Sequence, residues 1–254
     1  MRGRAARLAW PLLAAITPAQ QVDTPFSLGL KAYAAEQYEQ AMAYFEQAIQ
    51  AEPAVARHHE WYGKACGRRA ERVFFPRALG LARKVRSSFE KAVELEPTNV
   101  EALSELFEFY LRAPGLVGGG EDKARAVVER IRALDAAEGH RTSADMLLKS
   151  KDFAGAEQQL RKALELEPAK LARLLDLASL LAERGRHREA DALFDRAAEL
   201  APNAPAYLFA RGKQLALSRR DPQQARQMLE RYLRSQRGPD DPPPSEVREL
   251  LKKL

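Results

Sequence analysis

The same spacing of small and bulky apolar residues occurs four times in this 254-residue chain, each time ending at a proline. Each copy has an alanine five positions before the proline and an apolar residue eight positions before it. Three of the copies also have an alanine twelve positions before. The copies are Ala41, Phe45, Ala48 and Pro53; Val85, Phe89, Ala92 and Pro97; Ala156, Leu160, Ala163 and Pro168; and Ala190, Phe194, Ala197 and Pro202. The recurrence predicts an array of similar units, because one such unit cannot bury its apolar face alone.

The spacing within a unit is typical of two antiparallel helices in close contact. The alanines are small because the two helix axes approach closely there, and the bulky residue between them fills the remaining gap. Glycines such as Gly29 and Gly63 permit the same close approach from the preceding helix. The proline ends the second helix. We therefore expect an all-α fold.

This pattern resembles the tetratricopeptide repeat, in which a 34-residue unit carries W-x2-L-G-x2-Y, then alanine and aromatic positions, then proline. Pro168 and Pro202 are 34 positions apart, and two degenerate units are also readable. The resemblance implies a right-handed α-solenoid of about six helix hairpins. We expect units at about 22–55, 56–99, 100–136, 137–170, 171–204 and 205–238.

The last sixteen residues, 239–254, are expected to form a Pro-rich linker and a capping helix. In the segment after the prolines, Val247, Leu250, Leu251 and Leu254 fall on one helical face. Such a face closes the open end of a repeat stack. A docking segment for a partner or a membrane is the alternative.

Two units are longer than the 34-residue period and therefore contain insertions. One lies at about 70–84 and includes Phe74 and Phe75, and the other is the glycine-rich segment 114–120. The second insertion, with Phe109, Tyr110, Ala113, Lys123 and Ala124 around it, is similar to a loop of signal-peptide-bearing bacterial tetratricopeptide-repeat proteins. A phosphate-binding loop is disfavoured, because Glu121 stands where that motif requires lysine. We expect a structural loop that turns away from the stack, with a partner contact as the alternative.

The N-terminus is interpreted as a signal peptide at 1–19. Three arginines precede the apolar stretch from Leu8 to Ile16, and small residues precede a cleavage point after Ala19. An uncleaved anchor or a transit peptide is the alternative. The apolar stretch is too short to span a bilayer, so no transmembrane segment is expected in the mature chain. A periplasmic or secreted location follows from this interpretation.

Composition excludes several other classes of protein. An apolar share of 46% argues against disorder throughout, and the single cysteine, Cys66, excludes a disulfide scaffold. Without residues 1–19 the formal charge falls from +6 to +3, so no nucleic-acid partner is expected. The four histidines show no metal-binding spacing, and no arrangement typical of nucleophilic catalysis is recognisable. We therefore expect no enzyme activity, no cofactor and no metal.

The first helix of each unit should line the concave inner wall of the array. Alignment of the chain with the repeat predicts which side chains line this wall. They are apolar in the first unit, and in the middle units they carry charges of both signs with an excess of basic residues. The candidate partner-binding residues are Phe26, Leu30, Tyr33, Arg57, Glu60, Lys64, Arg68, Glu108, Arg112, Arg141, Asp145, Lys149, Phe209 and Lys213, with Ser104, Leu175 and Ser179 beside them.

These expectations together favour a non-catalytic scaffold that binds a peptide or a helix of another protein in the groove. The basic middle suits a partner with acidic character. Two alternatives remain open at this point. The chain could be an accessory subunit of a bacterial envelope transport or assembly complex, or a ligand-binding module with a closed pocket.

Overall fold

The computed structural model describes residues 23–254, which form thirteen α-helices and one short 3-10 helix, with no strand among them. The signal-peptide interpretation of 1–19 therefore concerns residues outside the described part of the chain. The first twelve α-helices form six pairs: α1 (Pro25–Ala34) with α2 (Tyr38–Ala51), α3 (Ala56–Ala70) with α4 (Phe75–Leu95), α5 (Val100–Arg112) with α6 (Glu121–Leu134), α7 (Ala136–Lys149) with α8 (Phe153–Leu166), α9 (Leu171–Glu183) with α10 (His187–Leu200), and α11 (Pro205–Ser218) with α12 (Pro222–Arg234). The last helix is α13 (Pro244–Leu251). The expected all-α solenoid of six helix pairs is confirmed.

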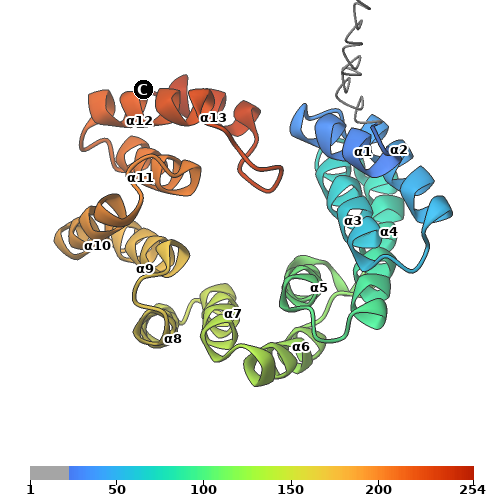
Figure 1. Cartoon of the computed structure of the whole chain (residues 1–254). Coiled ribbons are helices and arrows are strands. Elements are labelled where there is room, and N and C mark those ends of the chain that lie inside the picture. Colours follow the sequence, from blue (N-terminus) through green and yellow to red (C-terminus); the bar gives the residue numbers. More distant parts are fainter. Residues whose placement is uncertain (1–22) are drawn as a thin grey trace, which may run out of the picture.

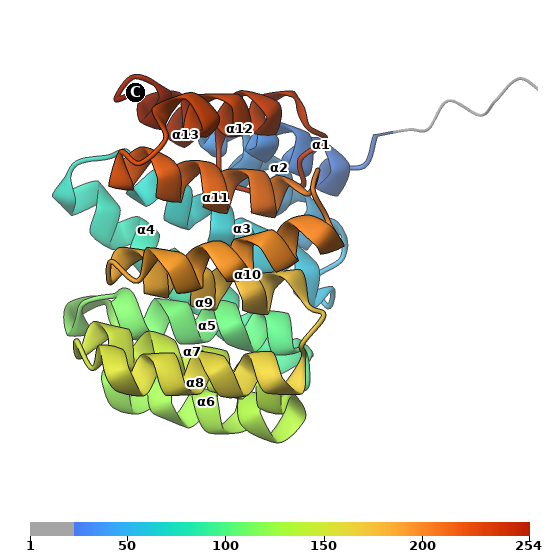
Figure 2. The same ribbon diagram turned by 90° about the vertical axis from the view of Figure 1, so that its left-hand side faces the viewer.

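The six pairs follow one another around a nearly closed ring (Figure 1). The first helix of each pair lies on the inner side of the ring, and the second helix lies outside it. Seen from the side, the helices are stacked with their axes close to parallel (Figure 2). The segment between α12 and α13 comes back toward α1 and α3, so the two ends of the array lie near each other.

Packing within each pair follows the sequence pattern, in which a bulky apolar residue lies between two small ones. All twelve of those residues, from Ala41 to Ala197, are buried, and none is more than 7% exposed. One close approach is at Gly63, where an added Cβ would lie 2.6 Å from the Phe89 ring, and Gly29 approaches the Phe45 ring in the same way, at 2.5 Å. Only glycine fits there without moving a buried aromatic side chain.

The apolar core is divided into two clusters along the array. One cluster runs from Ala32 to Ile131 and the other from Ala144 to Leu250, so the division falls at the junction of α6 and α7. Val247 and Leu250 of α13 pack onto the second cluster. No helix within 23–254 is both long and apolar enough to cross a bilayer.

The first insertion extends the start of α4, which reaches 21 residues. Phe74 and Phe75 begin this extension and remain exposed, at 66% and 68%. The glycine-rich insertion behaves differently from the sequence expectation.

The expectation that the glycine-rich insertion turns away from the stack is wrong. It forms the 3-10 helix η1 (Gly115–Val117), which packs against α4, and Val117 is buried within the first core cluster. Gly118 follows with φ +96°, and Lys123 Nζ donates to its carbonyl oxygen at 3.0 Å. A single buried valine and this lysine therefore hold the loop on the array.

Candidate interaction surface

The predicted partner-binding residues lie on the inner helices of the ring, but most of them contact other residues of the same chain. The apolar wall predicted for the first unit, on α1, is an example. The centres of the Phe26 and His58 rings are 4.9 Å apart. The Arg57 guanidinium carbon lies over the Phe26 ring, 5.1 Å from its centre. Tyr33 is only 8% exposed and lies edge-on against Trp61 at 5.3 Å. The wall expected to be open is therefore largely part of the contact between the first two units.

The next predicted group surrounds Lys64 on α3, which is buried rather than free. Its ammonium contacts carboxylates from three segments: Asp240 at 2.9 Å, Glu60 at 3.0 Å, Glu105 at 3.2 Å and Glu101 at 3.5 Å. Burial raises the pKa of the Glu60 carboxyl to about 7, although Lys64 opposes this shift. Burial also raises the pKa of Glu105. One lysine charge cannot balance four carboxylates, and Glu60 is the most buried of them, so protonation of Glu60 relieves the excess negative charge.

A second polar contact across the ring is made by Ser245 at the start of α13. Its backbone N–H donates to Glu36 Oε1 at 3.0 Å, and its hydroxyl donates to Glu36 Oε2 at 2.5 Å. Arg72 of the turn after α3 also contacts Glu36, at 2.5 Å. Burial would raise the pKa of Glu36, but the hydrogen bonds from Ser245 and Arg72 hold it below its ordinary value.

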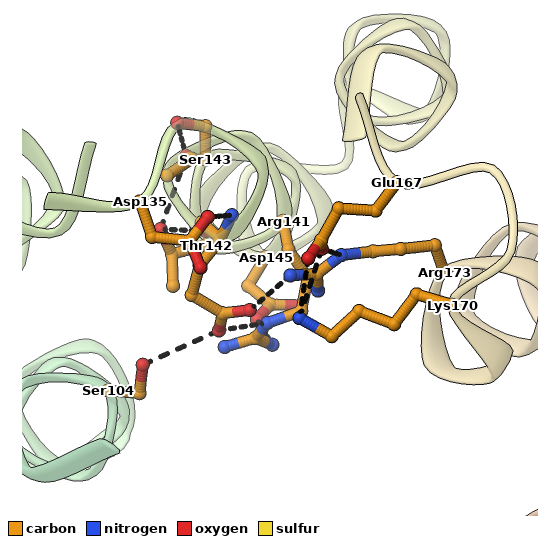
Figure 3. A network of polar contacts seen from close by, with 11 residues as sticks. Ser104, Asp135, Arg141, Thr142, Ser143, Asp145, Glu167, Lys170 and Arg173 are labelled. Atoms are coloured by element: carbon orange, nitrogen blue, oxygen red, sulfur yellow. Dashed lines mark hydrogen bonds and ion pairs between the residues drawn. The ribbon is translucent and has the colours of Figure 1, made fainter. Parts of the chain in front are cut away.

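The middle of the inner wall is a polar network in which Arg141 of α7 lies close to Arg173 of α9 (Figure 3). Glu138 of α7 is at its centre, because it contacts both arginines. Glu138 accepts from Arg141 at 2.5 Å and from Arg173 of α9 at 2.8 Å. Arg173 also donates to Glu167 at 2.8 Å, and its side chain is 2% exposed. The network links α7 to α9, and the Ser104 hydroxyl of α5 donates to Glu138 Oε1 at 3.4 Å, so one long hydrogen bond extends it across the division between the two apolar clusters.

The other predicted charges of the middle wall are likewise paired within the chain. Arg141 donates to Asp145 at 2.8 Å, and Arg112 lies 2.8 Å from Glu108. Lys149 Nζ donates to the Leu111 carbonyl oxygen. The net-basic character expected from the sequence is thus largely compensated inside the wall. Arg68 contacts Glu71 at 3.5 Å and is half-buried.

The last two predicted residues, Phe209 and Lys213, line a hollow of about 490 Å³ between α9 and α11. Leu217 lines the same hollow and is 60% exposed. Lys213 Nζ lies 5.3 Å from the centre of the Phe209 ring and 3.5 Å from Glu246. The hollow therefore combines apolar lining with a half-exposed cation.

Sequence reasoning located part of this hollow and missed the rest. It identified Phe209 and Lys213, because the repeat register puts them on the inner wall. It missed Leu217 and His187, whose Nδ1 is buried in the described structure without a hydrogen-bond partner. An apolar residue at the end of α11, where repeats expose polar residues, is the signal that could have located Leu217. Among residues 23–254, no three histidine, cysteine or acidic side chains are arranged to hold a metal ion.

The fold and this inner wall define a helical-repeat protein. A family model described as tetratricopeptide repeat matches residues 147–213, and a second model with the same description matches residues 26–71. The chain is a tetratricopeptide-repeat protein. No curated protein sequence matches it.

Solved structures show the same fold at low sequence identity. One is a thermophilic tetratricopeptide-repeat protein of Thermus thermophilus, 23% identical, with a TM-score of 0.57; the match covers 76% of this chain and 96% of that one. Another is the pilF protein of Pseudomonas aeruginosa, 18% identical, with a TM-score of 0.50; the match covers 91% of this chain and 97% of that one. At these identities the similarity concerns the fold alone.

Proposed function

We propose that this protein is a non-catalytic scaffold that binds a short segment of another protein on the inner side of its array, without a cofactor. The hollow between α9 and α11 is the main anchor. The observation that carries the proposal is the contrast between this hollow and the rest of the inner wall. Here a large apolar side chain, Leu217, is exposed beside Phe209, whereas the charges elsewhere are paired with one another.

The size and chemistry of the hollow indicate what it holds. A volume of about 490 Å³ lies within the range of ligand-binding pockets and suits one or two side chains of a peptide. A bulky apolar residue of the partner would pack against Leu217 and Phe209. An acidic residue near it would reach Lys213, whose contact with Glu246 is long at 3.5 Å. We therefore expect the partner segment to carry an acidic group, with its apolar residue as the main determinant of affinity.

A peptide library displayed on phage and selected against the mature chain tests this proposal. The selected peptides should share a bulky apolar residue. Their affinities are then measured by fluorescence anisotropy for the wild type and for Leu217→Asp, which should bind at least about tenfold more weakly, a loss of about 1.4 kcal/mol. The control is Leu116→Asp on η1, because Leu116 is equally exposed, at 67%, but lies outside the hollow.

The two variants make the outcome decisive. Affinity that is lost in Leu217→Asp and kept in Leu116→Asp supports the hollow as the anchor. Peptides that bind both variants as well as the wild type place recognition elsewhere and overturn the assignment, as does a library that yields no binder. Circular dichroism checks that both variants keep their helices.

We also propose that the protein acts in the periplasm or outside the cell. This rests on the arginines and the apolar stretch of 1–19, interpreted as a cleaved signal peptide. N-terminal sequencing of the protein purified from cells should find a chain that begins at Gln20. A chain that still begins at Met1 would contradict cleavage.

A further inference from the structure

The segment between α12 and α13 crosses from the last unit of the array to the first (Figure 1). It contains Gly238-Pro239-Asp240-Asp241 and three further prolines before Ser245. Together with the first two residues of α13, it is called the closing segment here and comprises residues 237–245. It lies against the inner face of α1 and α3, where the sequence predicted a site for a partner.

The apolar part of this contact joins prolines to tyrosines. Tyr33 and Tyr38 of the first unit line a cavity of about 90 Å³ together with Pro239, Pro242 and Pro243. Pro243 has φ −67° and ψ 147°, which is the polyproline II conformation. Grooves lined by aromatic residues recognise proline-rich segments in this conformation. The contact therefore has the chemistry of peptide recognition rather than of helix packing.

The polar part of the contact fixes the closing segment at two points. Asp240 reaches the buried Lys64 ammonium at 2.9 Å, and Ser245 donates twice to Glu36. The segment is also held by its own end of the array, because the Tyr232 hydroxyl donates to the Pro242 carbonyl oxygen at 2.5 Å. Asp240 itself is 54% exposed, so its contact with Lys64 can break without unfolding either end.

A surface pocket lies beside the contact. Its volume is about 250 Å³, and Arg68, Arg72, Pro243 and Glu246 line it. Helix α13 keeps its apolar contacts with α11 and α12 whether or not the closing segment touches α1 and α3.

We propose that the inner face of α1 and α3 is a binding site for a proline-rich segment that carries an aspartate, and that the closing segment occupies this site in the free protein. A partner segment of the same chemistry competes with it. This site is separate from the hollow between α9 and α11 and goes beyond the proposed function. Because the closing segment is tethered, its effective concentration is on the order of millimolar, so an outside segment binds weakly until the closing segment is released.

The test uses the full-length mature chain and a labelled synthetic peptide with the sequence of residues 237–245. In the double variant Asp240→Asn/Ser245→Ala the closing segment loses the charge opposite Lys64 and the hydroxyl hydrogen bond to Glu36, and keeps only the backbone hydrogen bond from residue 245. We expect this variant to bind the peptide at least about tenfold more tightly than the wild type, the effect of losing about one charge-assisted hydrogen bond of the competitor. The matched control, Asp195→Asn on the exposed side of α10, should bind like the wild type.

A second peptide, with asparagine in place of the aspartate that corresponds to Asp240, tests recognition. It should bind the double variant at least about tenfold more weakly than the first peptide. Equal affinity of the two peptides would overturn the assignment of Lys64 as the anchor. Equal affinity of the first peptide for the wild type and the double variant would overturn the competition.

A distance measurement keeps these outcomes interpretable. Spin labels are placed on cysteines introduced at the exposed positions Gln47 of α2 and Gly238 of the closing segment, while the buried Cys66 does not react. The double variant and the peptide-bound protein should both show a longer, broader distance than the free wild type. An unchanged distance in the double variant would mean that Asp240 and Ser245 do not hold the closing segment, and would also overturn the proposal.

Discussion

Lys64 of α3 and Asp240 of the closing segment form an ion pair at 2.9 Å, although 176 positions separate them in the sequence. In most repeat proteins each unit contacts only its neighbours, and stability is close to a sum of local terms. Here the first and last units also contact each other directly. The ends of the array are thereby coupled to each other as well as to their neighbours.

The Glu138 network should be a major source of stability between the helix pair α7–α8 and the next pair, α9–α10. Replacing the buried arginine, in Arg173→Met, is expected to lower the free energy of unfolding by about 3 kcal/mol, because Glu138 then keeps only Arg141 and Glu167 keeps only the more exposed Lys170. Urea denaturation measures the change. Arg161→Met is the control: Arg161 is 44% exposed and pairs with Glu157 on the surface, so its loss should amount to at most about 1 kcal/mol. Equal losses in the two variants would contradict a linking role for the network.

Stability should decrease between about pH 5 and pH 7.5. Burial raises the pKa of Glu60 to about 7 and that of Asp176 to about 6, above their ordinary values of 4.5 and 3.8. The folded protein therefore binds more protons than the unfolded chain in this range, and stability is lost as the pH rises through the folded pKa. Carboxyls with a lowered pKa, such as Glu138, act in the opposite direction, but only near and below about pH 4.5.

The variant Glu60→Gln tests the assignment of this pH dependence. A neutral amide at this position cannot lose a proton, so the free energy of unfolding should vary less with pH, by on the order of 3 kcal/mol over the range. Urea unfolding at several pH values between about 5 and 8 compares the variant with the wild type. A pH profile that is the same for both proteins would show that Glu60 does not titrate in this range.

The close approach of α3 and α4 should not tolerate a side chain at Gly63. Gly63→Val is expected to reduce stability by about 2 kcal/mol, because its Cβ would press on the buried Phe89 ring. Gly80→Val on α4 meets no atom within 4 Å of the added Cβ and should change stability by less than about 0.5 kcal/mol. Thermal unfolding of both variants provides the comparison, and a neutral Gly63→Val would disprove the packing argument.

The glycine-rich insertion should depend on Gly119 in the same way. A Cβ added there would lie 1.8 Å from the Ala113 carbonyl oxygen, a backbone atom that no rotamer change can move away. Gly119→Ala should therefore detach η1 from α4 and reduce stability by at least about 1 kcal/mol. Limited proteolysis should then cut near Leu116. Gly115→Ala has open space around its added Cβ and should remain as resistant as the wild type.

The part of the fold that sequence could predict is the part determined within one unit. The small and bulky residues of the repeated pattern, such as Ala156 and Leu160, pack between two consecutive helices. Their spacing is therefore visible in the sequence. The tetratricopeptide repeat and the six-pair solenoid followed from that spacing. The inner-wall positions of Phe209 and Lys213 could be predicted for the same reason, because the register alone places them on an inner helix.

The exposure of the inner wall could not be predicted, because it depends on residues from other units. Lys64 looks like a free cation on α3, but Glu105 from the next unit and Asp240 from the end of the chain cover it. Arg173 was missed for a similar reason, since its partners Glu138 and Glu167 lie on the preceding unit. The position of η1 depended on one buried valine, Val117, which gives no periodic signal.

The closing segment also limits how many units this array can contain. Solenoids ordinarily lengthen or shorten by whole repeats during evolution, because each added unit only needs to match its two neighbours. Here an inserted or deleted helix pair would change the total curvature of the array. The change would move Asp240 away from Lys64, and Ser245 away from Glu36. The closing segment therefore constrains the number of repeats, because only an array of this length brings its two ends into contact.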